Sequence, residues 1–444
     1  MESARGVASG RPNVVLVVID TLRPDHLNHY GYPRPTAAAF DSFAADATRF
    51  EEAFSPSSWT APSAASLHTG LLPTRHRLAE YGAGLNADVV TLAETLHAAG
   101  WRTVGHSFNH HVSRKTGFGQ GFDDFDDFLG GSQVYPDVSV MVDRVATWLE
   151  NKPAAPFFLY LQPMNTHGPY RVPVADETAL LGRAPSQTFQ YYGPLMTDIV
   201  KGGRLARRAE VTPAYLESLR EQYDTAIRYT TDQVGRVFAM LRAAGLYDQS
   251  LIIVTADHGE ELFDHGGFSH GYSLHRELLR VPLYVKLPGQ RQASTVRART
   301  SLVDVVPTVL DVLGLPHPEP TDGLSLRALL PGAPPTTAPW QDRTLVHEVD
   351  WPERCVARAI VSGPHKLIEV ERNYEGHRDE ILLFDVERDP GETTNLASTQ
   401  PEVVGRLRTA LGQAMAQAKA TAVGRSEIVI RELDQERLRA LGYL

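Results

Sequence analysis

Residues 13–19, with the sequence NVVLVVI, constrain the fold of this chain most strongly, because six apolar residues follow one another without a polar break. Such a run predicts a strand that is buried on both faces, as in a parallel sheet covered by helices on both sides. Asp20 follows the run directly, and open α/β sheets place functional groups at the carboxyl ends of their strands. A turn or helix-capping role would explain Asp20 equally well at this point.

Similar apolar runs alternate with amphipathic segments along the chain, which predicts an α/β fold with a large, mostly parallel sheet flanked by helices. Further strands are expected at residues 101–107, 156–162, 251–255 and 281–287. Helices are expected at residues 40–50, 89–99, 139–149, 223–244 and 301–313, and a loop at 118–128. Ser301 and Asp304 have the spacing of a capping pair at the start of the last of these helices.

A Pro-rich stretch at residues 331–339 marks the expected boundary between two domains. Residues 11–330 would form the catalytic α/β domain and residues 340–444 a smaller α+β domain. In the second domain, short strands of an antiparallel sheet are expected at 344–347, 357–362, 366–370 and 381–386, a helix at 401–418, and an apolar tail docked on the protein at 438–444.

The composition excludes several classes of function. The formal net charge is −10 and the sequence has no long basic run, which disfavours nucleic acid or an anionic membrane as a partner. No stretch approaches the roughly 20 apolar residues that span a bilayer. Cys355 is the only cysteine, so no internal disulfide can form, and a cytoplasmic protein is expected. The oligomeric state is left open.

Thr60 stands where a loop leads into a predicted short helix that ends at Gly70. Pro62 suits the first helical turn, where its missing N–H group would have no partner in any case. A helix N-terminus presents unpaired N–H groups and binds anions, so a hydroxyl at this place is positioned to attack a tetrahedral anion. The alternative is an ordinary capping threonine.

Reactive side chains follow three of the predicted strands. Asp20 follows the first, His167 the strand 156–162, and the pair Asp257-His258 the strand 251–255. Parallel strands bring their carboxyl ends to one edge, so these residues can meet near Thr60. Two carboxylates and an imidazole form a ligand set for one divalent metal, which would activate the Thr60 hydroxyl.

His167 and His270 could contact the non-bridging oxygens of an ester or protonate its leaving group. His270 lies in the sequence HGGFSHG together with His265, and both histidines precede a glycine. Each of them would serve equally well as a turn residue.

Seven segments of the chain together resemble the sulfatase family of the alkaline phosphatase superfamily. They are NVVLVVIDTLRPDHLNHYGY, SWTAPSAASLHTG, THGPY, TADHGEELFDHGGFSHG, RVPLYVKLPG, LLFDVERDPGETTNLA and the terminal LRALGYL. The resemblance implies a sulfatase-like fold with a large α/β domain and a smaller C-terminal domain.

The resemblance also implies roles for individual residues. Asp20, Asp257 and His258 fall on metal-ligand positions, with Thr60 as the nucleophile that also contacts the metal. His167 and His270 fall on positions that contact the substrate and the leaving group, the second often occupied by lysine in the family.

Three departures separate this chain from sulfatases, which convert the Cys or Ser of C/S-x-P-x-R into formylglycine. Thr60 cannot become formylglycine, Ala64 replaces the arginine of the motif, and Thr21 stands where many sulfatases have a second metal-binding aspartate. A threonine ester lacks the second hydroxyl of a formylglycine hydrate, so it must be cleaved by in-line attack of water or an acceptor. The ligand set favours Mn²⁺ or Zn²⁺ over Ca²⁺, since imidazole suits transition metals.

The sequence therefore predicts a metal-dependent hydrolase or transferase that cleaves a phosphoester, phosphodiester or phosphonate through Thr60. One alternative is a sulfuric ester hydrolase that works without formylglycine. Another is a catalytically silent binding protein of the same family. The substrate would be a small-molecule ester, in a pocket shaped by residues 108–135 and 171–213.

Overall fold

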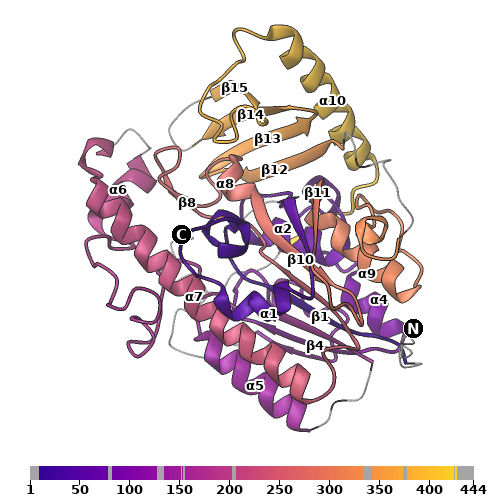
Figure 1. Cartoon of the computed structure of the whole chain (residues 1–444). Coiled ribbons are helices and arrows are strands. Elements are labelled where there is room, and N and C mark those ends of the chain that lie inside the picture. Colours follow the sequence, from indigo (N-terminus) through magenta and orange to yellow (C-terminus); the bar gives the residue numbers. More distant parts are fainter. Residues whose placement is uncertain are drawn as a thin grey trace.

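The computed structural model describes residues 10–78, 83–127, 135–151, 153, 156–202, 207–333, 340, 343–373, 378–424 and 426–427. Within them, one eight-stranded sheet forms the body of the molecule and a four-stranded antiparallel sheet lies beside it, next to the C-terminal helix (Figure 1). This arrangement confirms the predicted α/β fold with a smaller C-terminal α+β part.

The large sheet is mixed, with a parallel centre. Its order is β11 (Ser294–Ser301), β2 (Thr48–Phe54), β10 (Arg280–Lys286), β7 (Ser250–Thr255), β1 (Asn13–Val18), β6 (Phe157–Gln162), β4 (Arg102–Ser107) and β5 (Asp124–Asp126). Strand β1 is buried along its whole length and pairs in parallel with β6 on one side and β7 on the other. Strand β10 runs antiparallel to both of its neighbours.

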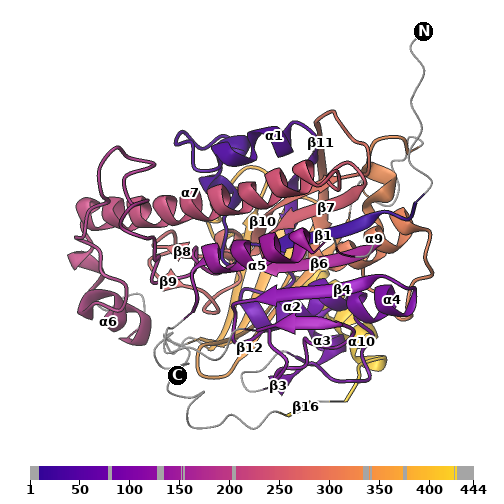
Figure 2. The same ribbon diagram turned by 90° about the horizontal axis from the view of Figure 1, so that it is seen from below.

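Helices cover both faces of this sheet, as its buried strands require. Helices α5 (Val138–Glu150) and α7 (Pro213–Ala243) lie side by side, and α2 (Thr60–Thr69), α4 (Leu92–Ala98) and α9 (Val305–Leu313) form a second group (Figure 2). The shorter helices are α1 (Asp41–Ala44), α3 (Pro73–His76), α6 (Pro194–Gly202) and α8 (Arg276–Leu279). Ser301 and Asp304 form the predicted capping box, ahead of α9.

The C-terminal part is a meander packed on one helix. Strands β12 (Leu345–Trp351), β13 (Cys355–Ser362), β14 (His365–Asn373) and β15 (Arg378–Asp385) pair in sequence order. Helix α10 (Pro401–Ala420) buries Val404, Leu407 and Leu411 against this sheet. The described residues also contain two short antiparallel pairs, β8 (Glu261–Leu262) with β9 (Phe268–Ser269), and β3 (Ala83–Gly84) with the distant β16 (Ser426–Glu427).

Two predictions about the large sheet were wrong, and one strand was missed. The helix predicted at residues 40–50 is reduced to the four-residue helix α1. Strand β2 begins at Thr48 and pairs with β10 and β11. Strand β5 lies inside the predicted loop 118–128, and β11 was not predicted. These strands are short or carry many polar residues, so tertiary pairing rather than local pattern decides them. The tail 438–444 and most of the linker 331–339 lie outside the described residues.

Glu392 joins the C-terminal part to the large domain through a buried ion pair. Its carboxylate accepts hydrogen bonds from Lys366 Nζ at 2.7 and 2.9 Å, from His275 Nδ1 at 3.0 Å and from the Arg276 amide at 3.2 Å. Burial alone would raise the pKa of Glu392, but Lys366 and His275 outweigh that effect and lower it to about 2. The two domains therefore share one buried charge cluster.

We expect Glu392→Gln to destabilise the protein by about 3–5 kcal/mol at pH 7, because it leaves the Lys366 ammonium buried without a counter-charge. A carboxylate with a lowered pKa contributes stability above its unfolded-state pKa and loses it as the pH falls toward the folded-state value. The difference between variant and wild type should therefore shrink between pH 4.5 and about 2. Denaturant unfolding at several pH values measures it, with the exposed Glu387→Gln as the control. Equal stability of Glu392→Gln and wild type at pH 7 would contradict this assignment.

Candidate active site

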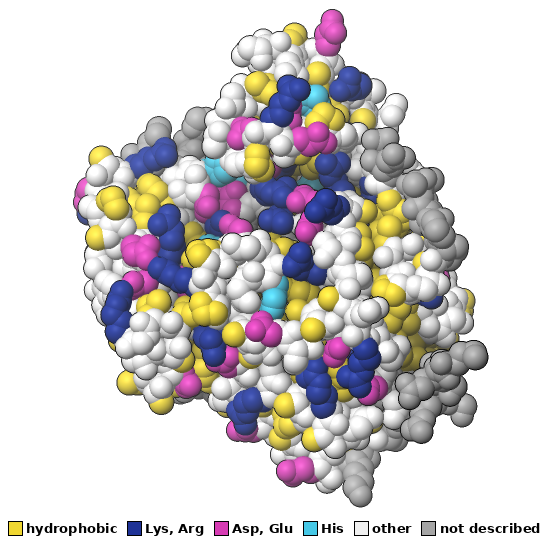
Figure 3. Space-filling view, viewed as in Figure 1, with side chains coloured by type: hydrophobic (Ala, Val, Ile, Leu, Met, Phe, Trp, Pro, Cys, Tyr) yellow, Lys and Arg dark blue, Asp and Glu magenta, His cyan; other side chains and the backbone are white. Residues whose placement is uncertain are grey.

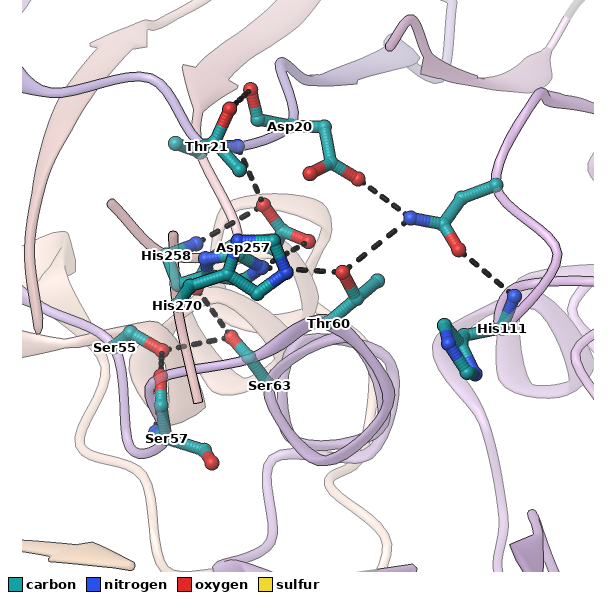
Figure 4. A network of polar contacts seen from close by, with 12 residues as sticks. Asp20, Thr21, Ser55, Ser57, Thr60, Ser63, His111, Asp257, His258 and His270 are labelled. Atoms are coloured by element: carbon teal, nitrogen blue, oxygen red, sulfur yellow. Dashed lines mark hydrogen bonds and ion pairs between the residues drawn. The ribbon is translucent and has the colours of Figure 1, made fainter. Parts of the chain in front are cut away.

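The polar residues that follow β1 and β7 meet at the carboxyl edge of the sheet. One ligand atom from each of Asp20, Asp257 and His258 lies within 4.8 Å of the other two, and all three side chains are buried. Thr60, at the first position of α2, points at this cluster (Figure 4). The parallel pairing of β1 with β7 brings these segments together, although more than 230 residues separate them in sequence.

The backbone around the two aspartates is held in place by hydrogen bonds. Asp257 Oδ1 accepts from the amides of Thr21 at 3.2 Å and His258 at 3.0 Å. Thr21 has a left-handed backbone (φ 55°), and its hydroxyl donates to the carbonyl of Thr166 at 2.7 Å. Thr21 therefore supports the site through both its amide and its hydroxyl. Gly259 is needed for space, because a Cβ atom there would lie 1.9 Å from the carbonyl oxygen of Glu277.

The residues of the cluster fit a divalent metal. Asp20 Oδ1 and Asp257 Oδ2 are buried and have no hydrogen-bond partner among the described residues. Burial, and then the charge of Asp257, raise the pKa of Asp20 well above its usual range. His258 Nδ1 is 2.8 Å from the carbonyl of Gly259, so Nδ1 donates and Nε2 keeps its lone pair for a ligand. A bound cation would satisfy both orphaned oxygens and offset the repulsion between the carboxylates.

Thr60 does not cap its helix. Trp59 occupies the N-cap position, with no side-chain capping bond, and Thr60 is the first helical residue. The Thr60 Oγ1 atom lies 3.1 Å from His258 Nε2 and accepts a hydrogen bond from Asn109 Nδ2 at 3.3 Å. The capping interpretation of Thr60 is therefore wrong.

Asn109 belongs to the site but was not singled out from the sequence. Its Nδ2 atom donates to Asp20 Oδ2 at 2.6 Å as well as to Thr60 Oγ1, so it bridges the cluster and the hydroxyl. It stands just after β4, at the same sheet edge as the other site residues. The rule that found Asp20, a polar residue after a buried strand, would also have found Asn109.

The two predicted histidines lie next to the cluster. The ring of His270 is 4.5 Å from that of His258 and 5.0 Å from that of His167, between centroids. Burial, and then His270, lower the pKa of His167 to about 3. Burial, then His258 and Arg354, lower the pKa of His270 well below its usual range. Both rings are therefore neutral at pH 7.

Glu260 was also missed by the sequence analysis. Its Oε2 atom lies 3.2 Å from His270 Nδ1 and orients that ring. Burial raises the pKa of Glu260 to about 7, and the positive charge of Arg23 and Arg354 only partly opposes this effect. His265 lies apart from the cluster, with its Nδ1 atom 2.8 Å from Glu277 and its ring stacked on His275. The structure thus separates the two histidines of HGGFSHG.

Two family models cover the chain. The model described as Sulfatase matches residues 12–315, and the model described as N-sulphoglucosamine sulphohydrolase, C-terminal, matches residues 264–420. The chain belongs to the sulfatase family. Members of this family are metal-dependent hydrolases of sulfate or phosphate esters, which confirms the prediction of an ester hydrolase at that level.

The names of individual relatives state different activities. Arylsulfatase K of Bos taurus is 26% identical over 443 residues, which cover 89% of this chain and 80% of that protein. The multifunctional alkaline phosphatase superfamily protein PehA of Trinickia caryophylli is 30% identical over 296 residues, 59% of this chain and 56% of that protein.

The solved structures support the fold. A protein in complex with its substrate D-glucosamine-2-N,6-O-disulfate superposes with a TM-score of 0.75 at 20% identity, over 92% of this chain and 98% of that one. A phosphonate monoester hydrolase of Silicibacter pomeroyi superposes with a TM-score of 0.71 at 20% identity, over 93% and 96%. Among the described residues of this chain, no helix combines the length and apolarity that a bilayer crossing requires.

We expect Asp20→Asn to raise the thermal stability of the metal-free protein and to reduce the stabilisation that a bound metal provides. Asp20→Asn removes one of two adjacent buried charges, so the metal-free variant should melt above the metal-free wild type. Added Mn²⁺ or Zn²⁺ should stabilise the wild type by about 2.7 kcal/mol at a hundredfold excess over Kd and the variant far less. Thermal unfolding with a chelator and with each metal tests both effects, with the exposed Asp143→Asn as the control. An equal metal-induced shift in Asp20→Asn and wild type would contradict the assigned ligand.

Proposed function

We propose that this protein is a metal-dependent hydrolase, or a transferase, that cleaves a phosphoester, phosphodiester or phosphonate with Thr60 as nucleophile. The observation that carries the proposal is the position of Thr60 Oγ1, which contacts His258 and Asn109 at the N-terminus of α2. Since threonine cannot become formylglycine, the sulfatase reaction that depends on that group is closed to this chain.

The proposed reaction has two displacements. The Thr60 hydroxyl gives its proton to solvent, and its oxygen bonds to phosphorus while the bond to the leaving oxygen breaks. Water or an acceptor alcohol then attacks phosphorus in line, and Thr60 regains its proton as the P–Oγ1 bond breaks. A divalent ion held by Asp20, Asp257 and His258 would lower the pKa of the Thr60 hydroxyl and stabilise charge on the ester oxygens.

The remaining side chains would position the ester and handle protons. Asn109 Nδ2, already within reach of Thr60 Oγ1, can donate to an oxygen on the attacked phosphorus. His270 can give a proton from Nε2 to the leaving oxygen while Glu260 is protonated and donates to His270 Nδ1 at 3.2 Å, since a neutral ring carries one hydrogen. Nδ1 then takes the Glu260 proton, and the pKa of about 7 makes Glu260 a suitable donor. The Nδ1 atom of His167 donates to the carbonyl of Gly168 at 2.7 Å. Only one nitrogen of a neutral ring carries hydrogen, so Nε2 has a lone pair and cannot donate to a non-bridging oxygen. We therefore assign His167 the role of acceptor, toward a substrate hydroxyl or the attacking water.

A sulfuric ester is the competing substrate, since the name of a relative that covers most of this chain is arylsulfatase K. Two features favour phosphorus. The neutral histidines and Asn109 surround a metal site of N and O ligands, which suits Mn²⁺ or Zn²⁺. The residue four places after Thr60 is Ala64, so the arginine expected from the sulfatase motif is missing.

Thr60→Ala should lower kcat/KM by about 10³-fold or more, because the nucleophile is removed. Thr60→Ser should retain a measurable rate, since it keeps a hydroxyl at the same position. Mass spectrometry of enzyme quenched in acid during turnover should find phosphate on Thr60. Thr69→Ala, at the far end of the same helix, is the control. Full activity of Thr60→Ala would disprove the nucleophile assignment.

A panel of nitrophenyl esters tests the substrate class. We expect nitrophenyl phosphate, bis-nitrophenyl phosphate or a phosphonate monoester to be cleaved at least about tenfold faster than nitrophenyl sulfate, a difference of 1.4 kcal/mol in barrier. Each ester is assayed with Mn²⁺, Zn²⁺ and Ca²⁺ after removal of bound metal. A dominant rate on nitrophenyl sulfate would replace this proposal with a sulfatase that works without formylglycine.

A further inference from the structure

Basic and acidic side chains are intermixed on the face of the molecule that Figure 3 shows. Such a mixture presents no extended field of one sign to a charged partner on that face. Buried polar atoms without a hydrogen-bond partner each need an explanation, because burial without a partner destabilises a protein. The amide nitrogen of Gln162 is such an atom in the described part of the chain, and it lies beside the candidate metal site.

Gln162 is the last residue of β6, which lies between β1 and β4 in the centre of the large sheet. The residue is completely buried. Its carbonyl accepts a hydrogen bond from the Phe108 amide at 3.2 Å, and the carbonyl of the next residue, Pro163, accepts from the Asp20 amide at 3.2 Å. The other residues of the strand, 157–161, are apolar or aromatic. Gln162 is therefore the polar end of an apolar strand, at the edge that carries the metal cluster.

Tyr160 fixes the direction of the Gln162 amide. The Tyr160 hydroxyl donates to Gln162 Oε1 at 2.6 Å, and residues two apart in a strand point to the same side of the sheet. Since Oε1 is the acceptor end of the amide, the donor end, Nε2, is turned away from Tyr160. Burial, and then the charges of Asp257 and Asp20, raise the pKa of Tyr160 well above its usual range, so the hydroxyl keeps its proton and remains a donor.

The donor end of this amide acts on Asp20. Burial and the charge of Asp257 raise the pKa of Asp20, and the amides of Asn109 and then Gln162 lower it. Asn109 Nδ2 donates to Asp20 Oδ2 at 2.6 Å. Asp20 Oδ1 and Gln162 Nε2, in contrast, both lack a hydrogen bond of ordinary geometry among the described residues. The site therefore holds one acceptor and one donor, on neighbouring side chains, that are not yet joined.

We propose that Gln162 is a positioning residue of the metal site and holds Asp20 in the orientation that binds the ion. A carboxylate oxygen has two lone pairs, so Asp20 Oδ1 can bind a cation with one and accept from Gln162 Nε2 with the other. Hydrogen-bond partners of this kind orient ligating carboxylates, and their loss typically weakens metal binding by about 10- to 100-fold. Gln162 has this role only if the proposed metal site exists, whichever group is the nucleophile.

Calorimetric titration of the whole chain with Mn²⁺, and separately with Zn²⁺, tests this role after dialysis against a chelator. Gln162→Leu should weaken metal binding about tenfold or more, because leucine is similar in size but has no donor. Gln413→Leu, at an exposed position of α10, is the matched control and should bind as the wild type does. Equal affinity of Gln162→Leu and wild type would overturn the proposal and leave the metal site intact. Absence of binding to the wild type would overturn both.

Tyr160→Phe removes only the hydroxyl that orients the amide, and it keeps the test decisive if Gln162→Leu does not fold. It should weaken Mn²⁺ binding at least about threefold. The double variant of Tyr160→Phe with Gln162→Leu should match Gln162→Leu within about twofold, because Tyr160 acts through Gln162. A merely structural pair would instead lower the melting temperature of the metal-free protein and leave the Mn²⁺ affinity unchanged, which would overturn the proposal. Losses that multiply in the double variant would disprove the orienting role of Tyr160.

Discussion

The site depends on the parallel pairing of β1 with β6 and β7 at the centre of the large sheet. Three strands that are adjacent in space and run in one direction must end at one edge. Asp20, His167 and Asp257 follow these three ends, and Asn109 follows the next strand, β4. The buried apolar strands thus position four polar side chains that come from segments far apart in sequence.

The convergence places the Asp20 and Asp257 carboxylates close together in a buried site. No lysine or arginine side chain of the cluster itself offsets their repulsion. Asp20 and Asp257 each keep one buried oxygen without a partner in the described structure, and each carboxylate already uses its other oxygen. His167 and His270 beside the cluster are neutral because burial opposes their charged form. The partnerless carboxylate oxygens lower the stability of the metal-free protein, but they are also the groups that a cation would bind. Such a loss of stability at a site that binds a ligand is common in proteins.

The C-terminal sheet is connected to the candidate active site by several contacts. The Trp351 ring lies 4.7 Å from the ring of Trp59, the residue before Thr60. His347 on β12 donates to the Ser55 carbonyl, and the Ser55 hydroxyl donates to Ser63 Oγ at 2.8 Å. Ser63 in turn donates to the carbonyl of Asp257 (Figure 4). The C-terminal part therefore supports the loop that carries Thr60 and the loop that carries Asp257.

The sequence by itself determined the buried central strands and the polar residues at their ends, because these are local properties of pattern and residue type. It did not identify β2 as a strand, since the spacing of apolar residues in 40–50 also fits a helix and pairing with β10 and β11 overrides it. Asn109 follows a predicted strand, so the rule that found Asp20 would have found it, whereas only the tertiary structure brought Glu260 into the site and separated His270 from His265. Those outcomes depend on which strand ends lie side by side and on how deeply each group is buried, and neither property is encoded in local spacing.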